Sequence, residues 1–170
     1  MTGPFQTERL TLRLTDESDA PFIQELVNTP QWLEYIGDRE VRSEEDAARY
    51  IREMMLPQVR RLGYGNYTVL LTADGTRIGT CGLYDRKGMD FPDLGFAYLP
   101  KFHRRGYGLE AAQKLIELAF THLDYERILA ITVPENIGSQ RLLERLGFAR
   151  EGTVRLPKDE VELLRYALDR

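Results

Sequence analysis

Several short stretches of the chain alternate apolar and polar residues with a period of two, which is the pattern of a β-strand with one buried face. Strands are predicted at 10–14, 67–71, 77–84, 94–99, 128–133 and 161–168. A turn sequence at 73–76 joins the second and third of these, so the middle of the chain predicts an antiparallel meander. The segment 128–133 is almost entirely apolar and predicts a strand that is covered on both faces.

In other stretches the apolar residues recur every three or four positions, as on one face of an amphipathic helix. Helices are predicted after the capping residues 16–19, from the cap Ser43, from near Leu109 and from Ile137. Residues 28–30 end the first helix, Pro57 should kink or stop the second, and Gly147 caps the end of the last. The long third helix has its apolar stripe on Leu109, Ala112, Ile116, Ala119, Phe120 and Leu123.

The predicted order is therefore β-α-α-β-β-β-α-β-α-β. It describes a mixed α/β domain whose one parallel crossover is the strand-helix-strand unit at 94–133. No repeat, low-complexity tract or linker divides the 170 residues, so residues 1–170 are expected to form a single domain.

Composition narrows the class of protein. One cysteine cannot form an internal disulfide, and with only two histidines there is no ligand cluster for a metal, so we expect no metal and a reducing, cytoplasmic location. The longest apolar run is too short to span a membrane, and the N-terminus lacks the pattern of a signal peptide. The net charge of −4 and the isoelectric point near 5.3 argue against a nucleic-acid partner but allow a local basic patch for one small anion.

The densest chemical signal is residues 101–108, Lys-Phe-His-Arg-Arg-Gly-Tyr-Gly, between a predicted strand and the long helix. Gly106 and Gly108 let the backbone turn tightly, and the first N–H groups of the helix have no partner within it. The helix dipole and three cations add positive potential, so this segment, called the cradle below, suits a phosphate or pyrophosphate. An ordinary strand-to-helix turn with solvated arginines is the alternative.

The cradle also fits the dinucleotide-binding fingerprint, because Gly106-x-Gly108-x-x-Ala111 is followed by Glu135 after the next strand. In that fold a strand runs directly into the first glycine, whereas residues 100–105 intervene here. Only one β-α-β unit is predicted where several are needed, so a dinucleotide site is disfavoured.

A second motif lies at 136–148, where Asn136 and Ser139 share one face of the first helical turn. Asn136 is also a simple helix cap in the alternative interpretation. Together with Thr7-Glu8-Arg9-Leu10 and the segment 106–111, this motif resembles the GNAT superfamily of acyl-CoA-dependent N-acetyltransferases. Its pyrophosphate motif is R/Q-x-x-G-x-G/A, and its later motif is N-x-x-S followed by L-G-F. The subgroup most similar to this chain contains the ribosomal-protein alanine acetyltransferases.

The resemblance implies the GNAT-type acyl-CoA N-acyltransferase fold, in which the strand before the cradle and the strand after the helix splay apart. The pantetheine arm of acetyl-CoA would pair with the backbone of Phe96 and Tyr98, and a backbone N–H near Phe96 would meet the acetyl carbonyl. Asn136 would reach the pantetheine and Ser139 would lie near the thiol. The pyrophosphate would bind backbone N–H groups of the cradle, with phosphate charge offset by arginines, the residues concerned being His103, Arg104, Arg105, Gly106, Tyr107, Gly108 and Arg141.

Catalysis requires attack of a neutral amine on the thioester, and a base assists because a free amine is mostly protonated at pH 7. Asp93 lies where this subgroup often has an acid, and an edge-strand carboxylate is the alternative. Many family members use a Tyr seven residues after the Asn to protonate the leaving thiolate, but this chain has Leu143 there. Ser139 or a bound water is then the candidate acid.

Other candidate residues carry weaker signals. Cys81 is expected to be a small buried residue rather than a nucleophile, because nothing nearby lowers its pKa. His122 is expected at the surface, near the end of the long helix. Trp32, Tyr35 and Ile36 belong either to the core or to the wall of the acceptor pocket, which the family builds from this loop.

The predicted function is therefore transfer of an acetyl group from acetyl-CoA to a primary amine by direct attack in a ternary complex. The acceptor is a protein N-terminal amine or a small amine such as a polyamine, amino acid or antibiotic. A non-catalytic acyl-CoA sensor is a third possibility, because the usual acid is absent. Neither nucleic acid nor membrane is expected as a partner, and the protein is expected as a monomer or homodimer.

Overall fold

The computed structural model describes residues 2–170 and contains one eight-stranded mixed sheet with strand order β1-β2-β3-β4-β5-β6-β8-β7. The strands are β1 (Phe5–Gln6), β2 (Leu10–Leu14), β3 (Asn66–Leu71), β4 (Arg77–Tyr84), β5 (Asp93–Tyr98), β6 (Arg127–Thr132), β7 (Ala149–Val154) and β8 (Leu163–Asp169). The α-helices are α1 (Ala20–Val27), α2 (Pro30–Tyr35), α3 (Glu44–Tyr50), α4 (Leu56–Leu62), α5 (Tyr107–Thr121) and α6 (Ile137–Arg145). Short 3₁₀ turns lie at Glu17–Asp19 and Pro100–Phe102.

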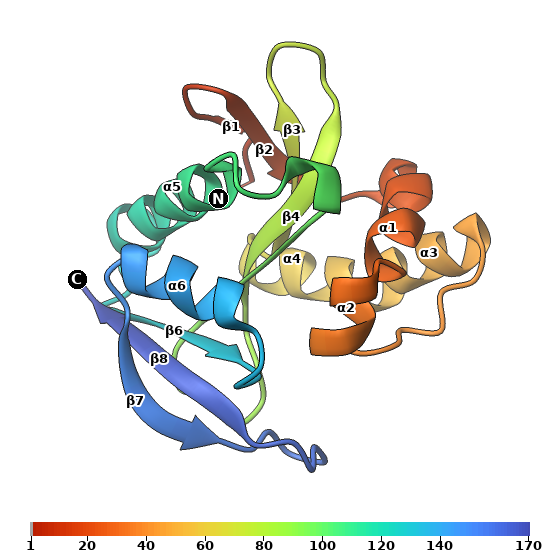
Figure 1. Ribbon diagram of the computed structural model, residues 1–170. Helices are drawn as coiled ribbons and strands as arrows, with labels where there is room; N and C mark the ends of the chain where they lie inside the picture. Colours follow the sequence, from red (N-terminus) through yellow and green to blue (C-terminus); the bar gives the residue numbers. More distant parts are fainter. Residues whose placement is uncertain (1) are drawn as a thin grey trace.

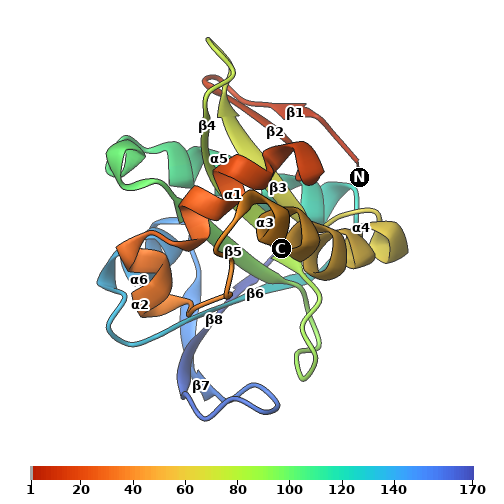
Figure 2. The ribbon, with the colours of Figure 1, turned by 90° about the vertical axis from the view of Figure 1, so that its right-hand side faces the viewer.

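The sheet separates two groups of helices (Figure 1). Helix α5 and helix α6 lie on one side, and α1 to α3 lie on the other, where Figure 2 views them face-on. The antiparallel meander β3-β4-β5 and the parallel β5-α5-β6 crossover are as predicted. Because β5 is the last strand of the meander and the first of the crossover, it lies at the centre of the sheet.

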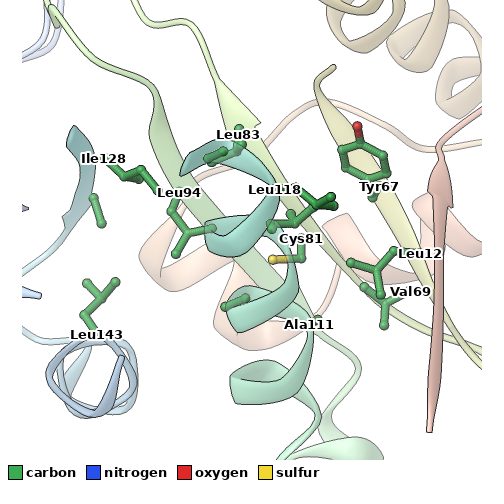
Figure 3. Close-up of a cluster of buried hydrophobic side chains, with 14 of the residues drawn as sticks. Leu12, Tyr67, Val69, Cys81, Leu83, Leu94, Ala111, Leu118, Ile128 and Leu143 are labelled. Carbon is green, nitrogen blue, oxygen red and sulfur yellow. The ribbon is translucent and has the colours of Figure 1, made fainter. Parts of the chain in front are cut away.

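The main core lies between the sheet and α5 (Figure 3). Strand side chains such as Tyr67, Cys81 and Leu83 pack there against the helix, and all three are fully buried. The predicted stripe on α5 is rotated slightly from the observed one. The innermost residues of α5 are Ala111, Ala112, Leu115, Leu118 and Ala119. Three of these residues are alanines, whose small side chains let the helix approach the sheet closely. The predicted stripe, in which large apolar side chains predominate, did not indicate this.

A second apolar cluster packs α1 against α3, and includes Ile23, Leu26 and Ile51. The predicted caps are confirmed: the Asp16 carboxylate accepts the Ser18 N–H at 2.8 Å, and the Ser43 hydroxyl accepts the Asp46 N–H at 3.0 Å. Pro57 does not stop the second helix, because α4 continues past it to Leu62. A π-helical turn at Ile51–Met55 widens the backbone just before α4, and Pro57 lies in the first turn of α4, where it is tolerated.

Three elements were not predicted: β1, α2 and β7. Strand β7 is the exposed edge of the sheet, so it lacks the alternation that identifies a half-buried strand. Helix α2 is only six residues long and begins at Pro30, which was taken as a helix stop. Gly147 ends α6 as predicted, with φ of 91°. Within residues 2–170 no helix is long and apolar enough to cross a membrane.

Candidate functional site

The two central strands β5 and β6 are paired only at one end. Their single register pair joins Asp93 to Leu129, where the Leu129 N–H donates to the Pro92 carbonyl at 2.9 Å. A continuous parallel ladder would carry on from there along β5. Because no later register pair is formed, the rest of β5 has an unpaired edge toward β6, and Asp93 lies at the apex of the gap.

The unpaired edge of β5 presents the backbone groups of Phe96 and Tyr98. The Leu99 N–H donates to Ile78 on β4 at 2.9 Å, and hydrogen-bonded pairs alternate along an antiparallel ladder. Ala97 and Gly95 therefore bond to β4, whereas the groups of Phe96 and Tyr98 point to the gap. The Tyr98 carbonyl already accepts a hydrogen bond from His103 Nε2 at 2.8 Å. Phe96 is thus the residue whose backbone is open to a ligand.

The cradle follows β5 and contains two left-handed residues, Arg104 with φ of 59° and Gly106 with φ of 80°. In the described part of the chain, residues 104–106 donate no backbone hydrogen bond outside the helices and strands, and the N–H groups of residues 107–109 are the first of α5, which have no partner within the helix. The N–H of His103 does have one, because it donates to the Pro100 carbonyl at 3.1 Å. The predicted donor set therefore begins one residue later than expected, at Arg104. Left-handed residues among unpartnered N–H groups are typical of an anion-binding concavity.

The cations around the cradle are free to meet an anion. Lys101, Arg104, Arg105 and Arg141 are exposed, and none of them forms an ion pair within residues 2–170. Lys101 and Arg105 lie over the Phe102 ring at 5.3 and 5.9 Å, contacts that orient them without neutralising their charge. Most arginines elsewhere on the chain are paired with carboxylates, so the local potential here is positive despite the negative net charge.

The N-terminal motif at residues 7–10 holds the cradle from outside. Glu110 on the first turn of α5 accepts hydrogen bonds from the Thr7 hydroxyl at 2.6 Å, the Arg9 N–H at 2.8 Å and Arg9 Nε at 2.7 Å. Arg9 also donates to the Arg105 carbonyl at 3.0 Å and lies 4.6 Å above the Tyr107 ring. Sequence analysis used this motif only for the resemblance; its contacts show that it braces the start of α5.

Gly108 is needed where α5 begins against its neighbours. A Cβ at this position would lie 3.2 Å from Leu142 of α6 and 3.3 Å from the Tyr98 ring. Either contact is tighter than most side chains tolerate. The glycine therefore lets the helix start, the strand and α6 meet at one point beside the cradle.

Asn136 and Ser139 form the first turn of α6. Asn136 Oδ1 accepts the Ser139 N–H at 3.1 Å, so Asn136 is a helix cap, as the alternative interpretation held. The cap uses only the oxygen of the amide, and the NH₂ group remains available to a ligand. Both residues line the same cavity as Asp93 and Phe96, so capping and ligand binding are compatible.

Asp93 is almost completely buried, with 2% of its side chain exposed. One carboxylate oxygen pairs with Arg86 Nε, and the other, Oδ1, is buried without a hydrogen-bond partner in the described residues. Burial raises the pKa of Asp93 and outweighs the opposing effects of Arg86 and of the Ile131 backbone N–H. The edge-strand alternative is wrong, because Asp93 lies at the centre of the sheet and not at its rim.

A cavity of about 670 Å³ lies over the gap. It contains the predicted residues Asp93, Phe96, Asn136 and Ser139 but neither Tyr98 nor the cradle, which lies at the other end of β5. The site therefore has an anion-binding end and a cavity end, joined by the unpaired strand edge.

The residues predicted in a loop lie on α2 (Trp32 and Tyr35) and directly after it (Ile36), and all three line the cavity. Trp32 is in addition part of the α1–α3 core. Met54, Ile36 and Val161 are exposed at 69%, 40% and 49% and give the cavity an apolar rim.

Leu143 also contacts the cavity but is 1% exposed and belongs to the main core, so this position offers no acid. Cys81 is fully buried, and burial raises the pKa of its thiol to about 12, which makes it unsuitable as a nucleophile, as predicted. His122 is exposed at the end of α5. In the described residues no cluster of His, Cys, Asp and Glu is arranged to hold a metal.

Tyr84 and Arg86 are among the cavity residues that the sequence did not predict. Arg86 pairs with Asp93, and its guanidinium lies 5.3 Å above the Tyr84 ring. The available signal was the pair Gly82 and Gly95, which face each other on β4 and β5. Two facing glycines inside a sheet indicate that something lies flat against it.

The fold, the unpaired strand edge and the cradle define an acyltransferase of the GNAT type. Residues 9–149 match the family model described as an acetyltransferase (GNAT) domain, so the chain belongs to this family of N-acetyltransferases. It is 31% identical over 155 residues to the uncharacterized N-acetyltransferase p20 of Bacillus licheniformis, covering 88% of this chain and 84% of that one. It is 27% identical over 171 residues to the aminoglycoside N(6')-acetyltransferase type 1 of Klebsiella pneumoniae, covering 88% and 79%.

Solved structures share the fold. The acetyltransferase from Agrobacterium tumefaciens superposes with a TM-score of 0.84 at 24% identity, covering all of this chain and 96% of that one. RimL, a ribosomal L7/L12 alpha-N-protein acetyltransferase solved in complex with coenzyme A, superposes with a TM-score of 0.74 at 19% identity and covers 98% and 97%. At these identities the likeness establishes the fold and not the acceptor.

Proposed function

We propose that this enzyme moves the acetyl group of acetyl-CoA to the N-terminal amine of a protein or peptide, by direct attack in a ternary complex. The N–H groups of 104–109 would hold the pyrophosphate, with Arg104, Arg105 and Arg141 offsetting its charge. The pantetheine would extend along the free edge of Phe96 as an added strand, and the amide of Asn136 would reach it from α6. The Phe96 N–H would stabilise the developing oxyanion.

Asp93 is the proposed general base, acting directly or through one water. Asp93 lines the cavity at the apex of the gap and carries a buried oxygen, Oδ1, that no described residue bonds, and this observation carries the assignment. A raised pKa also suits the role, because a base works best when its pKa approaches the working pH. The rate should therefore rise with pH as Asp93 loses its proton, at a pH above the ordinary range for an aspartate.

The proton of the leaving thiol has a less constrained source. Leu143 cannot supply it, and Ser139 is the hydroxyl-bearing residue of the family motif that lines the cavity. Ser139 or a bound water is therefore proposed as the donor. A CoA thiol is only weakly acidic, so this transfer need not limit the rate.

The cavity rim favours a peptide over a small polycation as acceptor. The exposed apolar side chains of Ile36, Met54 and Val161 suit an apolar residue beside the reacting amine. The charged residues that line the cavity are of both signs, namely Glu34, Asp93 and Asp159 with Arg39 and Arg86, whereas a polyamine or aminoglycoside would favour a strongly acidic wall.

The experiment is to follow free thiol while the protein and acetyl-CoA are incubated with a panel of acceptors. The panel contains peptides with free Ala, Ser or Met N-termini, the same peptides with blocked N-termini, spermidine, lysine and an aminoglycoside. We expect turnover on free peptides that blocking abolishes. Turnover on the small amines alone would replace the acceptor, and tight acetyl-CoA binding without thiol release on any acceptor would indicate a sensor.

Asp93→Asn tests the base on the best acceptor of that panel. We expect turnover to fall about 100-fold, within the range for loss of a general base, while the Kd for acetyl-CoA stays unchanged. Asp90→Asn is the matched control, because Asp90 is exposed on the loop that leads to the same strand. If turnover and Kd are both unchanged in Asp93→Asn, the assignment is wrong.

A further inference from the structure

The sheet face toward α1 and α3 contains a chain of buried polar side chains that the apolar core does not explain. Asn66, Thr15, Thr68 and Asp19 are each exposed by 4% or less. Asn66 Nδ2 donates to the Thr15 hydroxyl at 2.8 Å, the two threonine hydroxyls are 2.8 Å apart, and the Thr68 hydroxyl donates to Asp19 at 3.0 Å. The chain begins at the cavity, since Asn66 lines it, and ends at a buried carboxylate.

The Asp19 carboxylate determines the direction of the hydrogen bonds along this row of polar side chains. Arg13 and Arg77 bind Asp19 at 2.6 to 2.8 Å and keep it ionised, so it can only accept. The one proton of Thr68 therefore goes to Asp19, and Thr68 accepts from Thr15. Thr15 in turn accepts from the Asn66 amide, which leaves Asn66 Oδ1 as an acceptor at the cavity end.

Tyr84 fills that last position, because its hydroxyl donates to Asn66 Oδ1. Its ring is seated by two glycines: a Cβ on Gly82 would lie 2.8 Å from the Tyr84 hydroxyl oxygen, and one on Gly95 would lie 2.7 Å from the ring. Arg86 covers the ring at 5.3 Å. The ring position is therefore fixed by the two glycines and Arg86, and the only hydroxyl proton of Tyr84 is donated to Asn66.

We propose that the Tyr84 hydroxyl oxygen, which can now only accept, receives a hydrogen bond from the N–H of the neutral acceptor amine and orients its lone pair for attack. The inference rests on the proposed function. Tyr84 and Asp93 are register partners on β4 and β5 and line one cavity, and Gly95 beneath the ring directly precedes Phe96. A neutral primary amine has two hydrogens for these two acceptors, whereas an N-methyl amine or an alcohol has one. The pair would therefore select primary amines.

Tyr84→Phe tests the contact with the best peptide of the acceptor panel and with the same peptide carrying an N-methylated N-terminus. We expect kcat/KM for the primary amine to fall about 10-fold, as for one lost hydrogen bond, and the preference for the primary over the N-methyl peptide to shrink by a similar factor. The Kd for acetyl-CoA should not change. Tyr125→Phe is the control, because it removes a hydroxyl bonded to Tyr64 at 2.7 Å, away from the cavity.

A second pair of variants acts on the chain without touching the cavity. Thr68→Val removes the link to Asp19, and Thr68→Ser preserves it. We expect Thr68→Val to lower the preference for the primary amine about 3-fold and Thr68→Ser to restore it. An unchanged preference in Tyr84→Phe, or an equal loss in Tyr125→Phe, would overturn this inference alone. No thiol release by the wild-type enzyme on any acceptor would overturn the proposed function and this inference with it.

Discussion

The two ends of β5 present different kinds of chemical group to their proposed ligands. At the cradle end the ligand-facing groups are backbone N–H donors, arranged by two left-handed residues and a helix start. At the cavity end they are side chains from three strands and one loop, which form hydrogen-bonded pairs: Tyr84 with Asn66, and Arg86 of the loop after β4 with Asp93. The first end depends on local sequence, and the second depends on contacts between residues that lie far apart in the chain.

The difference has a functional meaning. A backbone site tolerates many side chains, so one fold can keep the same donor substrate while its sequence diverges. A side-chain site can change its acceptor by a few substitutions, because each group contributes its own hydrogen bond.

The largest effect is expected from a substitution that disrupts the hydrogen bonds between side chains behind the cavity end. Asp19→Asn should lower the free energy of unfolding by about 3 kcal/mol, because it removes a buried carboxylate from two partly exposed arginines, Arg13 and Arg77. Burial raises the pKa of Asp19, but the hydrogen bonds from Arg13 and Arg77 outweigh it and hold the pKa below its usual value. This stabilisation is therefore present above the ordinary pKa and is lost as the pH falls through the lowered one. Urea denaturation at several pH values measures it, and Asp16→Asn, at a half-exposed neighbour, should change little.

Gly108→Trp is expected to disrupt the cradle, where backbone N–H groups form the site. The new side chain has no room between Tyr98 and Leu142, so the first turn of α5 must move and the affinity for acetyl-CoA should fall about 100-fold or more. Calorimetric titration measures the Kd, and circular dichroism verifies the fold. Gly108→Ala should cost only a few-fold, because its neighbours need to yield by a few tenths of an ångström. Unaltered binding in Gly108→Trp would remove the cradle from the site.

Glu110→Gln tests the support of the cradle separately from its N–H donors, because it weakens the contacts with Thr7 and Arg9 and leaves the donors themselves unchanged. Burial raises the pKa of Glu110, but hydrogen bonds from Thr7 and Arg9 outweigh this and lower it. Wild-type affinity for acetyl-CoA should therefore weaken as the pH falls through the lowered pKa, and Glu110→Gln should weaken it by about 5-fold at neutral pH and lose that acid dependence. Glu117→Gln, an exposed residue of the same helix, is the control. Equal pH profiles for all three proteins would contradict the bracing role.

The smallest effect is expected at Ser139. Ser139→Ala removes the candidate acid but keeps the cap, since Asn136 bonds to the backbone N–H of this residue. Turnover should fall about 3-fold if the hydroxyl donates to the thiolate, because water replaces it readily. Steady-state turnover on the best acceptor is the measurement, and a wild-type value would assign the proton to water.

The same division explains what could be predicted from the sequence. The cradle and the Asn136 cap lie within short contiguous segments, so their spacing alone indicated them. The partners of Arg9 and Tyr84 are 101 and 18 residues away, and only the folded sheet brings them together. The family resemblance indicated Asp93, but its ion pair with Arg86 depends on the path of the loop at 85–92 between β4 and β5. Strand β7 escaped prediction because an exposed edge carries no apolar period.

The gap beside Phe96 also links ligand binding to the resistance of the protein to heat. Strands β5 and β6 form fewer hydrogen bonds with each other than the other neighbouring strands of the sheet do. An extended ligand would supply the missing hydrogen bonds as an additional strand. Any molecule that binds only the folded state raises its stability, by about 2.7 kcal/mol at a concentration 100 times the Kd. The melting temperature and the slowing of amide hydrogen exchange at Phe96 thus become readouts of occupancy that need no knowledge of the acceptor.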